Sequence, residues 1–573
     1  MSKIAKRVLI VVGAVMLLLV ALAFMARAGM QPGKGSVLEM AIEGEIPEEI
    51  PPDALAQILG TKRLALMDYV EALRRARDDG RINGALVIVD RSSLGFAQAQ
   101  ELRDALLDFQ KKGKWAVAYM ETAGEFSPGN KEYYLASACK SIWLAPPGDI
   151  NLTGLRADVP FVRGTLDKLG IYPDFDHIGK YKTAMNMLTE KAMTPAHRES
   201  MESLLDSFYG QLRRGIASGR KMSEEQVRSL VDRGPFLAPQ ALEAKLVDAL
   251  GYRDEVEDHL KKENGGRLPL IKVKRYLKSG RYYDHGARLA LIYGVGGVSR
   301  GESDYNPVSG SASMGSDTVA AAIRKAREDS SIKAIVFRVN SPGGSYIASD
   351  IIWREVMLTK GVKPIVVSMS DLAGSGGYFV AMGADWIVAQ PGTITASIGV
   401  LAGKLITTAF WDKVGITFDG IQRGRHATFY STGQRYTPEE KAIFEGWLGR
   451  IYKDFVGKAA QGRHKSFAEI DAVGQGRIWS GEEALRLGLV DEVGGLPAAI
   501  KRALELAKLP PEPRVQLVLM PEGKGLLEDL MDRGDDTRTG LLSLQEGAAR
   551  LLGGAALPAP ERVLEMPFVP DIR

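Results

Sequence analysis

Residues 371–399 read DLAGSGGYFVAMGADWIVAQPGTITASIG, and small residues crowd the start of this stretch. The apolar run 365–367 precedes it, and residues 378–382 are compatible with a helix. This order predicts a strand, a tight turn and a helix, with Ser375 at the helix N-terminus. A hydroxyl on such a turn lies beside free backbone N–H groups. Ser375 is therefore a candidate nucleophile, although its glycine neighbours lack the G-x-S-x-G spacing.

Length and composition limit the possible classes of protein. The chain has 573 residues, 45% of them hydrophobic, so we expect a globular protein with two or more domains. A net charge of +4 without a basic stripe makes nucleic acid an unexpected partner. The single Cys139 excludes an intramolecular disulfide, and the sequence has neither a Walker A run nor an H-E-x-x-H motif. We therefore expect no cofactor and no metal.

The N-terminus predicts a membrane anchor within residues 1–35. Lys3, Lys6 and Arg7 precede an uncharged run at 8–26, which is just long enough to span a bilayer. More positive charge before the run than after it predicts a cytoplasmic N-terminus, with the body outside the membrane. Ala26-Arg27-Ala28 resembles a small-x-small cleavage site, so a cleaved signal peptide is the alternative.

Beyond the anchor the chain repeats itself at a spacing of about 245 residues, which is the most specific feature of the sequence. The matching segments are LRRARDD (73–79) with IRKARED (323–329), IWLAPPG (142–148) with WIVAQPG (386–392), LDKLGI (166–171) with WDKVGI (411–416), Thr194-Pro195 with Thr437-Pro438, and KLVDALG (245–251) with GLVDEVG (488–494). Such a series indicates a duplicated domain.

Each half alternates β-branched runs with amphipathic helices, which is typical of an α/β fold with a mainly parallel sheet. In the second half we expect strands at 334–339 and 364–368 and a helix between them at 347–358. We place the first domain at 36–275 and the second at 285–505. The stretch 274–285 would link them, and 301–316 reads as a mobile loop. Residues 506–573 form a C-terminal appendage with short helical patterns at 526–531 and 541–552.

The halves differ where chemistry is expected. NSPGG (340–344) in the second half replaces RSSLG (91–95), and adjacent glycines let a backbone approach a ligand closely. Ser375 falls opposite Lys131, so the first half has no equivalent nucleophile. Conversely, GKYKT (179–183) in the first half stands opposite RGRHA (423–427), so Lys182 stands opposite His426. One half offers a serine and the other a lysine.

A serine nucleophile needs a base, and two candidates follow from this comparison. Lys182 lies among apolar residues, but it would have to be neutral near pH 7, about three units below its usual pKa of ~10.4. His426 is the other candidate, because imidazole is a common base at neutral pH. The remaining histidines show no triad pattern.

The sequence resembles the long, duplicated form of the bacterial signal peptide peptidase family, the protease IV type. The resemblance rests on the anchor, NSPGG, AGSGGY (373–378), TASIG (395–399), GKYK and GRIWSG (476–481). It implies an α/β fold of two tandem crotonase/ClpP-like domains behind one N-terminal transmembrane helix. Members are serine–lysine peptidases of the bacterial inner membrane with the catalytic body in the periplasm. A homo-oligomer, by resemblance a tetramer, is also implied.

The family pattern carries over to particular residues of this chain. It puts the nucleophile on Ser375, the general base on Lys182 and a lysine-orienting hydroxyl on Ser397. The oxyanion hole would come from the backbone N–H groups of Gly344 and Gly376. The expected substrates are cleaved signal peptides and other short hydrophobic peptides. A crotonase-like acyl-CoA enzyme and a catalytically inactive membrane scaffold are the two rival functions.

Overall fold

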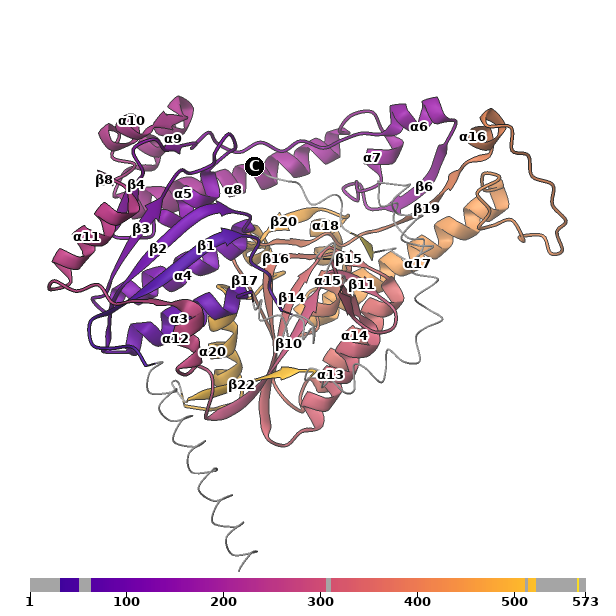
Figure 1. The fold of residues 1–573 in the computed structure, drawn as a ribbon. Coiled ribbons are helices and arrows are strands. Elements are labelled where there is room, and N and C mark those ends of the chain that lie inside the picture. Colours follow the sequence, from indigo (N-terminus) through magenta and orange to yellow (C-terminus); the bar gives the residue numbers. More distant parts are fainter. Residues whose placement is uncertain (1–30, 51–62, 306–310, 511–513, 522–563, 566–573) are drawn as a thin grey trace, which may run out of the picture.

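Two six-stranded parallel arrangements with the same strand order organise the computed structural model (Figure 1). The structure describes residues 31–50, 63–305, 311–510, 514–521 and 564–565. The order is β8-β4-β3-β2-β1-β9 in the first half and β21-β17-β16-β14-β10-β22 in the second. This correspondence confirms the internal repeat, and the parallel pairing confirms a mainly parallel α/β protein.

The first sheet is built from near-continuous apolar runs, as expected for strands covered on both faces. Its strands are β1 (Ser36–Gly44), β2 (Ile82–Ser92), β3 (Trp115–Met120), β4 (Ser141–Leu144), β8 (Ala249–Leu250) and β9 (Leu270–Lys272). A separate pair is formed by β5 (Asp149–Ile150) and β7 (Phe236–Leu237). The helices of this half are α3 (Leu66–Asp78), α4 (Phe96–Lys111), α5 (Asn130–Ala136), α6 (Arg163–Leu169), α7 (Asn186–Thr189), α8 (Pro195–Arg220), α9 (Glu224–Arg233), α10 (Ala238–Glu243), α11 (Arg253–Glu263) and α12 (Val273–Lys278).

The second sheet confirms the strands and the helix that the sequence predicts around residues 334–368. Its strands are β10 (Ala287–Val295), β14 (Ile332–Ser341), β16 (Ile365–Gly374), β17 (Trp386–Ala389), β18 (Ile394–Ala396), β20 (Ile478–Ser480), β21 (Glu492–Val493) and β22 (Val515–Met520). The helices are α13 (Ser316–Glu328), α14 (Tyr346–Thr359), α15 (Gly376–Ala381), α16 (Thr408–Lys413), α17 (Pro438–Arg463), α18 (Phe467–Val473), α19 (Gly481–Arg486) and α20 (Leu496–Leu506). Strand β22 lies within the C-terminal segment, where the sequence analysis expected no strand.

The longest helices show how the repeated Thr-Pro pairs act. In α8 and in α17 the threonine side chain accepts a hydrogen bond from a backbone N–H of the first turn, and proline follows at the first helical position. A capping hydroxyl and a proline at that position both favour helix initiation. The two helices have equal lengths of 26 residues, so the repeat extends to their ends.

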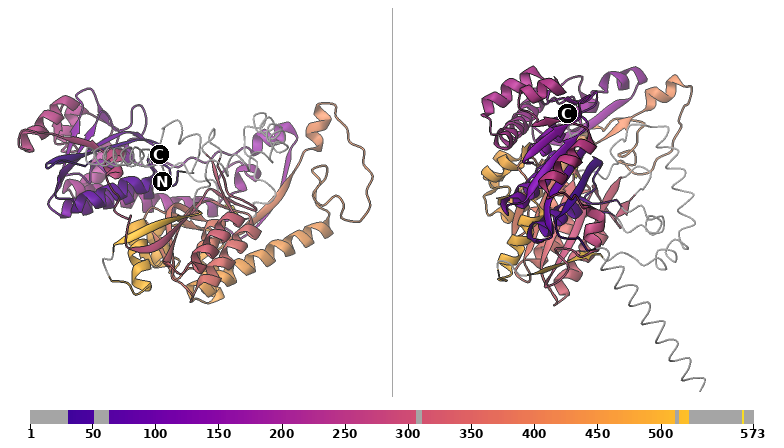
Figure 2. Two further views of the ribbon diagram at one scale, coloured as in Figure 1. Left: turned by 60° about the horizontal axis from the view of Figure 1, so that its bottom comes forward. Right: turned by 60° about the vertical axis from the view of Figure 1, so that its left-hand side comes forward.

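The halves are joined by elements that cross between them. Strand β6 (Tyr172–Ile178) of the first half pairs antiparallel with β19 (Val400–Ile406) of the second, in an arm that extends from the body (Figures 1 and 2). Helix α8 contacts β20, where Ser207 Oγ donates to Ser480 Oγ at 2.8 Å. On β14, Val336 packs in the core of the first half, while Ile335 and Phe337 pack in the core of the second.

A third, small sheet lies next to α15. Its order is β12-β13-β11-β15-β23, from β11 (Gly297–Ser299), β12 (Asp304–Tyr305), β13 (Ala312–Gly315), β15 (Gly343–Gly344) and β23 (Leu564–Glu565). Strands β12 and β13 fall within the expected loop 301–316, and α12 overlaps the start of the expected linker 274–285. The strand β23 brings part of the C-terminal segment beside the glycine pair.

Three predicted elements fall in segments that the structure does not describe. The predicted anchor run 8–26 and the helical patterns 526–531 and 541–552 lie outside the described residues. Within the described residues no helix is both long and apolar enough to cross a bilayer.

Candidate active site

Ser375 sits on a strained turn between β16 and α15, as predicted from the sequence. Its φ is +51°, a value that non-glycine residues adopt rarely and mostly where the surrounding structure enforces it. Its backbone N–H donates to Ala396 O at 2.7 Å, which ties the turn to β18. The side chain is fully buried. Ala396 and Ser397 also have positive φ, so unusual backbone geometry concentrates at this point.

Lys182, from the first half, reaches this turn of the second half. Its Nζ donates to Ser375 Oγ at 2.8 Å, and it lies 3.1 Å from both Ser397 O and Ser397 Oγ. The lysine side chain is fully buried. The structure thus brings together Ser375 and Lys182, which the comparison of the halves singled out, and Ser397, which the family resemblance added.

This arrangement suits proton transfer between the amine and the hydroxyl. A general base must lie within hydrogen-bond reach of the proton that it removes, and 2.8 Å meets that condition. Burial disfavours a charged ammonium group, and therefore favours the neutral amine that a base requires. A neutral Nζ at this position can accept the proton of Ser375 Oγ.

The two glycines expected to form the oxyanion hole lie together beside the serine. A Cβ atom built on Gly376 would come within 3.0 Å of Gly344 N and 3.1 Å of Gly343 Cα. Gly344 has φ of +152°, and a Cβ there would lie 2.2 Å from Val298 O. A side chain at Gly344 would clash with the backbone, and one at Gly376 would force its neighbours to shift, so glycine at both places favours the close approach of α15 and β15 (Figure 1).

The corresponding turn of the first half has no nucleophile. Tyr133 of α5 and Tyr378 of α15 occupy the same place in the repeat, because their hydroxyls donate to equivalent backbone oxygens of the two halves. Counting back three residues from each puts Asn130 opposite Ser375, so the sequence comparison, which put Lys131 there, was one residue too far along. The conclusion that the first half has no equivalent serine is unchanged.

His426 lies on the chain before α17, and its ring contacts acidic residues of that helix. Its Nε2 and Nδ1 lie 3.7 Å from carboxylate oxygens of Glu439 and Glu440, respectively. Lys182, by contrast, contacts Ser375 directly. The geometry therefore favours Lys182 over His426 as the partner of the serine.

The sequence analysis did not single out Asp371, which lies on β16 before Ser375 and links that strand to the first half. Its Oδ1 accepts the backbone N–H groups of Ala97 and Gln98, at the start of α4 in the other half. Burial raises the pKa of Asp371 to about 6, and the charge of Glu48 adds to the effect. The aspartate is visible in the sequence, but its partner lies more than 270 residues away, and no local pattern indicates such a contact.

The lysine loop is also fixed by a glycine that the sequence analysis did not single out individually. A Cβ on Gly476 would lie 2.4 to 2.5 Å from the backbone N, Cα and Cβ of Lys182. Gly476→Ala is therefore expected to displace the lysine and to lower kcat/KM by about 100-fold, the usual effect of a misplacement near 1 Å. Steady-state kinetics on a peptide substrate measures this.

Gly415→Ala is the matched control for that substitution. Gly415 has a φ of +76°, against +77° for Gly476, but nothing lies within 4 Å of its Cβ position. The Gly415→Ala variant therefore has the same backbone strain without the steric clash, and its activity should stay near that of the wild type. Equal activities for the two variants would contradict the steric explanation.

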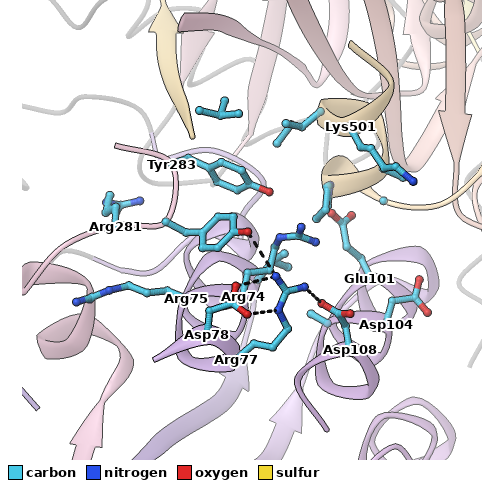
Figure 3. Close-up of a pocket in the computed structure, with 18 of the residues that line it drawn as sticks. Arg74, Arg75, Arg77, Asp78, Glu101, Asp104, Asp108, Arg281, Tyr283 and Lys501 are labelled. Atoms are coloured by element: carbon cyan, nitrogen blue, oxygen red, sulfur yellow. Dashed lines mark hydrogen bonds and ion pairs between the residues drawn. The ribbon is translucent and has the colours of Figure 1, made fainter. Parts of the chain in front are cut away.

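A pocket of about 890 Å³ lies apart from these residues, between the first half and α20 (Figure 3). Some of its charged side chains pair with one another: Arg77 bonds to Asp78 at 2.7 Å and to Asp108 at 2.6 Å. Neither Ser375 nor Lys182 lines it. In the part of the chain that the structure describes, no group of three or more His, Cys, Asp or Glu residues is placed to hold a metal ion.

Known proteins match the chain over most of its length. The description "Peptidase family S49" fits residues 108–266 and 358–510. "Serine protease SPPA, chloroplastic" of Arabidopsis thaliana is 34% identical over 87% of this chain and 73% of that protein. "Protease 4" of Salmonella typhi is 33% identical over 78% of this chain and 72% of that protein.

A shorter relative carries a more specific name. "Putative signal peptide peptidase SppA" of Enterococcus faecium is 32% identical over 30% of this chain and 50% of that protein. The two family segments together cover more than half of the chain, and they fall in the two repeated halves. The chain therefore belongs to peptidase family S49 and is a serine protease homologous to protease 4 and SppA.

Proposed function

We propose that the chain is a membrane-anchored endopeptidase that uses Ser375 as nucleophile and Lys182 as general base. The observation that carries this proposal is the 2.8 Å contact between Lys182 Nζ and Ser375 Oγ, in a fully buried environment. Ser397 orients the amine through its hydroxyl and its carbonyl oxygen, both 3.1 Å from Nζ. Each half has the crotonase/ClpP type of fold in this proposal, and the shared strand order supports it.

Acyl transfer then follows from the geometry. Ser375 Oγ attacks the substrate carbonyl carbon as its proton passes to the neutral Lys182 Nζ. The carbonyl oxygen becomes an oxyanion, which the N–H groups of Gly344 and Gly376 stabilise. When the C–N bond breaks, the lysine returns the proton to the leaving amine, and an ester remains on Ser375. Lys182 next takes a proton from water, whose oxygen attacks the ester carbon. When the bond from that carbon to Ser375 Oγ breaks, Lys182 returns the proton to Oγ and the second product leaves as an acid.

The small sheet supports binding of an extended peptide at the glycine pair. Strand β23 pairs antiparallel with β15, with Leu564 opposite Gly344 and Glu565 opposite Gly343. This edge of β15 therefore accepts an added strand, and a substrate bound there would take the place of β23. Strand addition is a common way to bind peptides. A substrate in that register would run past Ser375 in extended form. Substrates should accordingly be short or unfolded.

We assign cleaved signal peptides and other short hydrophobic peptides as the substrates, and the periplasmic side of a bacterial inner membrane as the location. The resemblance to the protease IV type and the name of the Enterococcus relative support the substrate class. The run 8–26 and its flanking charges support the anchor and its orientation. Protease added to spheroplasts should digest the body, whereas protection until lysis would reverse the orientation.

The homo-oligomer, a tetramer by resemblance, is supported by apolar surface on the arm. Ile421 is 91%, Tyr430 75% and Phe418 72% exposed, and residues of this size are seldom left in water together. Detergent-solubilised protein should scatter light as a multiple of 62.2 kDa. A monomer with full activity would remove the argument for assembly.

A peptide-library digest with the intact protein and Ser375→Ala side by side tests the proposed activity. The wild type should cleave hydrophobic peptides, and Ser375→Ala should lose cleavage together with covalent labelling by a serine-directed probe. Labelling without cleavage would favour a different acyl-transfer reaction. Absence of both in folded wild-type protein would indicate the inactive scaffold.

A further inference from the structure

A ring of contacts links the lysine loop to the turn after β18 that holds Ser397. Tyr181, the neighbour of Lys182, donates its hydroxyl to the two carboxylate oxygens of Glu199, at 2.8 and 3.0 Å. Glu199 lies near the start of α8, in the same half as the lysine. This part of the ring fixes the residue next to the base.

Arg477 closes the ring from the other half. Its Nη1 donates to Glu199 Oε1 at 2.6 Å and to the Tyr181 hydroxyl at 3.2 Å. The guanidinium also lies over the rings of Tyr181 and Trp479, 4.9 and 4.2 Å from their centres. Meanwhile the backbone oxygen of Arg477 accepts the N–H of Ser397 at 3.0 Å. One residue therefore binds both the neighbour of Lys182 and the residue that orients its amine.

The solvent exposure of these side chains indicates that their contacts orient the lysine loop more than they stabilise the fold. The Glu199 side chain is 53% exposed and that of Arg477 16%, and ion pairs so open to solvent add little net stability. Tyr181 is only 7% exposed, and the stacked guanidinium is held on two aromatic faces. Hydrogen bonds from Tyr181, and then from Arg477, hold the pKa of Glu199 below its usual range. The carboxylate is therefore charged at neutral pH and accepts both donors.

We propose that Tyr181, Glu199 and Arg477 form a positioning clamp that holds the Lys182 loop of one half against the turn of the other half that carries Ser397. None of the three contacts the reacting atoms, so the clamp acts only through the placement of Lys182 Nζ. The inference rests on the proposed role of Lys182 as the base. It adds that the position of Lys182 relative to Ser397 depends on a carboxylate, Glu199, that lies outside the active site and is partly exposed to solvent.

Glu199→Gln is the central test, because it keeps the shape of the side chain and removes its charge. We expect kcat on a short peptide to fall by about 10- to 100-fold, as for other small misplacements of a catalytic group, with KM within about twofold. Tyr181→Phe should act in the same direction. Because both variants break one ring, the double variant should lose less than the product of the single losses.

Glu482→Gln is the matched control. Glu482 also pairs across the halves with a residue of α8, Arg214, at 2.6 Å, but it has no contact with the lysine loop among its described interactions. Its kcat should match that of the wild type. If Glu482→Gln and Glu199→Gln lowered kcat equally, the loss would come from weaker contact between the halves in general. The clamp would then be overturned.

The pH profile distinguishes positioning from an electrostatic effect on the base. A clamp predicts a lower plateau of kcat with an unchanged midpoint, because Lys182 is displaced and its charge environment is little altered. The rate of Ser375 labelling by a serine-directed probe should fall in parallel. A shifted midpoint with an unchanged plateau would overturn the proposal, and so would full activity in both Glu199→Gln and Tyr181→Phe. Failure of the proposed function would give a different result: the Lys182→Ala variant would remain active.

Discussion

Lys182→Ala is expected to lower kcat by about 10³- to 10⁶-fold, as does removal of the activating base from other serine hydrolases. The amine contacts Ser375 Oγ at 2.8 Å, so its loss leaves the hydroxyl without its hydrogen-bond partner and proposed proton acceptor. KM should change little if peptide binding depends mainly on the β15 edge. Burst and steady-state kinetics on one peptide separate the two effects.

Lys182→Arg should be nearly as inactive as the alanine variant. A guanidinium stays protonated at any pH that the protein tolerates, so it cannot accept the serine proton. Wild-type activity should rise toward alkaline pH as the lysine loses its proton, and this limb should be absent in the arginine variant. An arginine variant with a normal pH profile would contradict the assignment.

Two controls accompany these variants. His426→Ala removes the alternative base and should leave turnover within a few fold. Lys404→Ala removes another buried lysine, whose Nζ donates to Phe429 O at 2.9 Å, and it should also leave the chemistry intact. A set in which His426→Ala abolished turnover while Lys182→Ala retained it would restore a serine–histidine enzyme.

Local patterns predicted most of the elements that carry the site. The apolar run before Ser375, the small residues around it and the repeat at about 245 residues led to the strand β16, the helix α15 and two related sheets. These signals are local or periodic, and one chain is enough to read them. The pairing of Ser375 with Lys182 came from comparing the halves and from the family resemblance.

Contacts between the halves could not be predicted in the same way. Asp371 caps the start of α4, and Arg477 binds Glu199, across 274 and 278 positions of the chain, respectively. Polar pairs at such separations leave no periodicity in the sequence. Strand β22 was missed because 515–520 is a short apolar segment beyond the last repeated motif, and only its pairing with β10 identifies it.

Arg338→Leu is expected to lower the free energy of unfolding by about 3–5 kcal/mol, the usual cost of breaking a buried ion pair. Arg338 is 1% exposed, and it bonds to Glu48 at 2.8 Å and to Glu101 at 2.9 Å, both of which are buried residues of the other half. It also donates to Ser368 at 2.9 Å. Without the guanidinium, two carboxylates remain in the core without their cation. Thermal and denaturant unfolding should both show the loss.

Arg324→Leu is the matched control for stability. Arg324 also pairs with a glutamate, Glu355, but its side chain is 53% exposed and Glu355 keeps a second partner in Arg327. The expected loss is about 1 kcal/mol or less. A loss as large as that of Arg338→Leu would show that burial is not what makes the Arg338 cluster costly to break.

The pH dependence of the Arg338→Leu deficit follows from the same contacts. Burial alone would raise the pKa of Glu48, but the charge of Arg338 and hydrogen bonds from Arg338, Ser370 and Gln98 hold it below its usual range. Burial raises the pKa of Glu101 even with the arginine present. Without the arginine, both folded-state pKa values should lie above those of the unfolded chain. The deficit should then be full above the folded pKa values and should shrink as pH falls through them.

Neutralising the carboxylates tests whether charge, rather than lost packing, causes the deficit. Arg338→Leu combined with Glu48→Gln and Glu101→Gln removes the unpaired charges while keeping the size of both side chains. We expect this triple variant to recover most of the lost stability and to lose the pH dependence, since an uncharged amide costs less to bury than a carboxylate. A triple variant as unstable as Arg338→Leu would mean that the cavity left by the arginine dominates. The ion pairs of Arg338 with Glu48 and Glu101 would then contribute less to stability than the packing of the arginine side chain does.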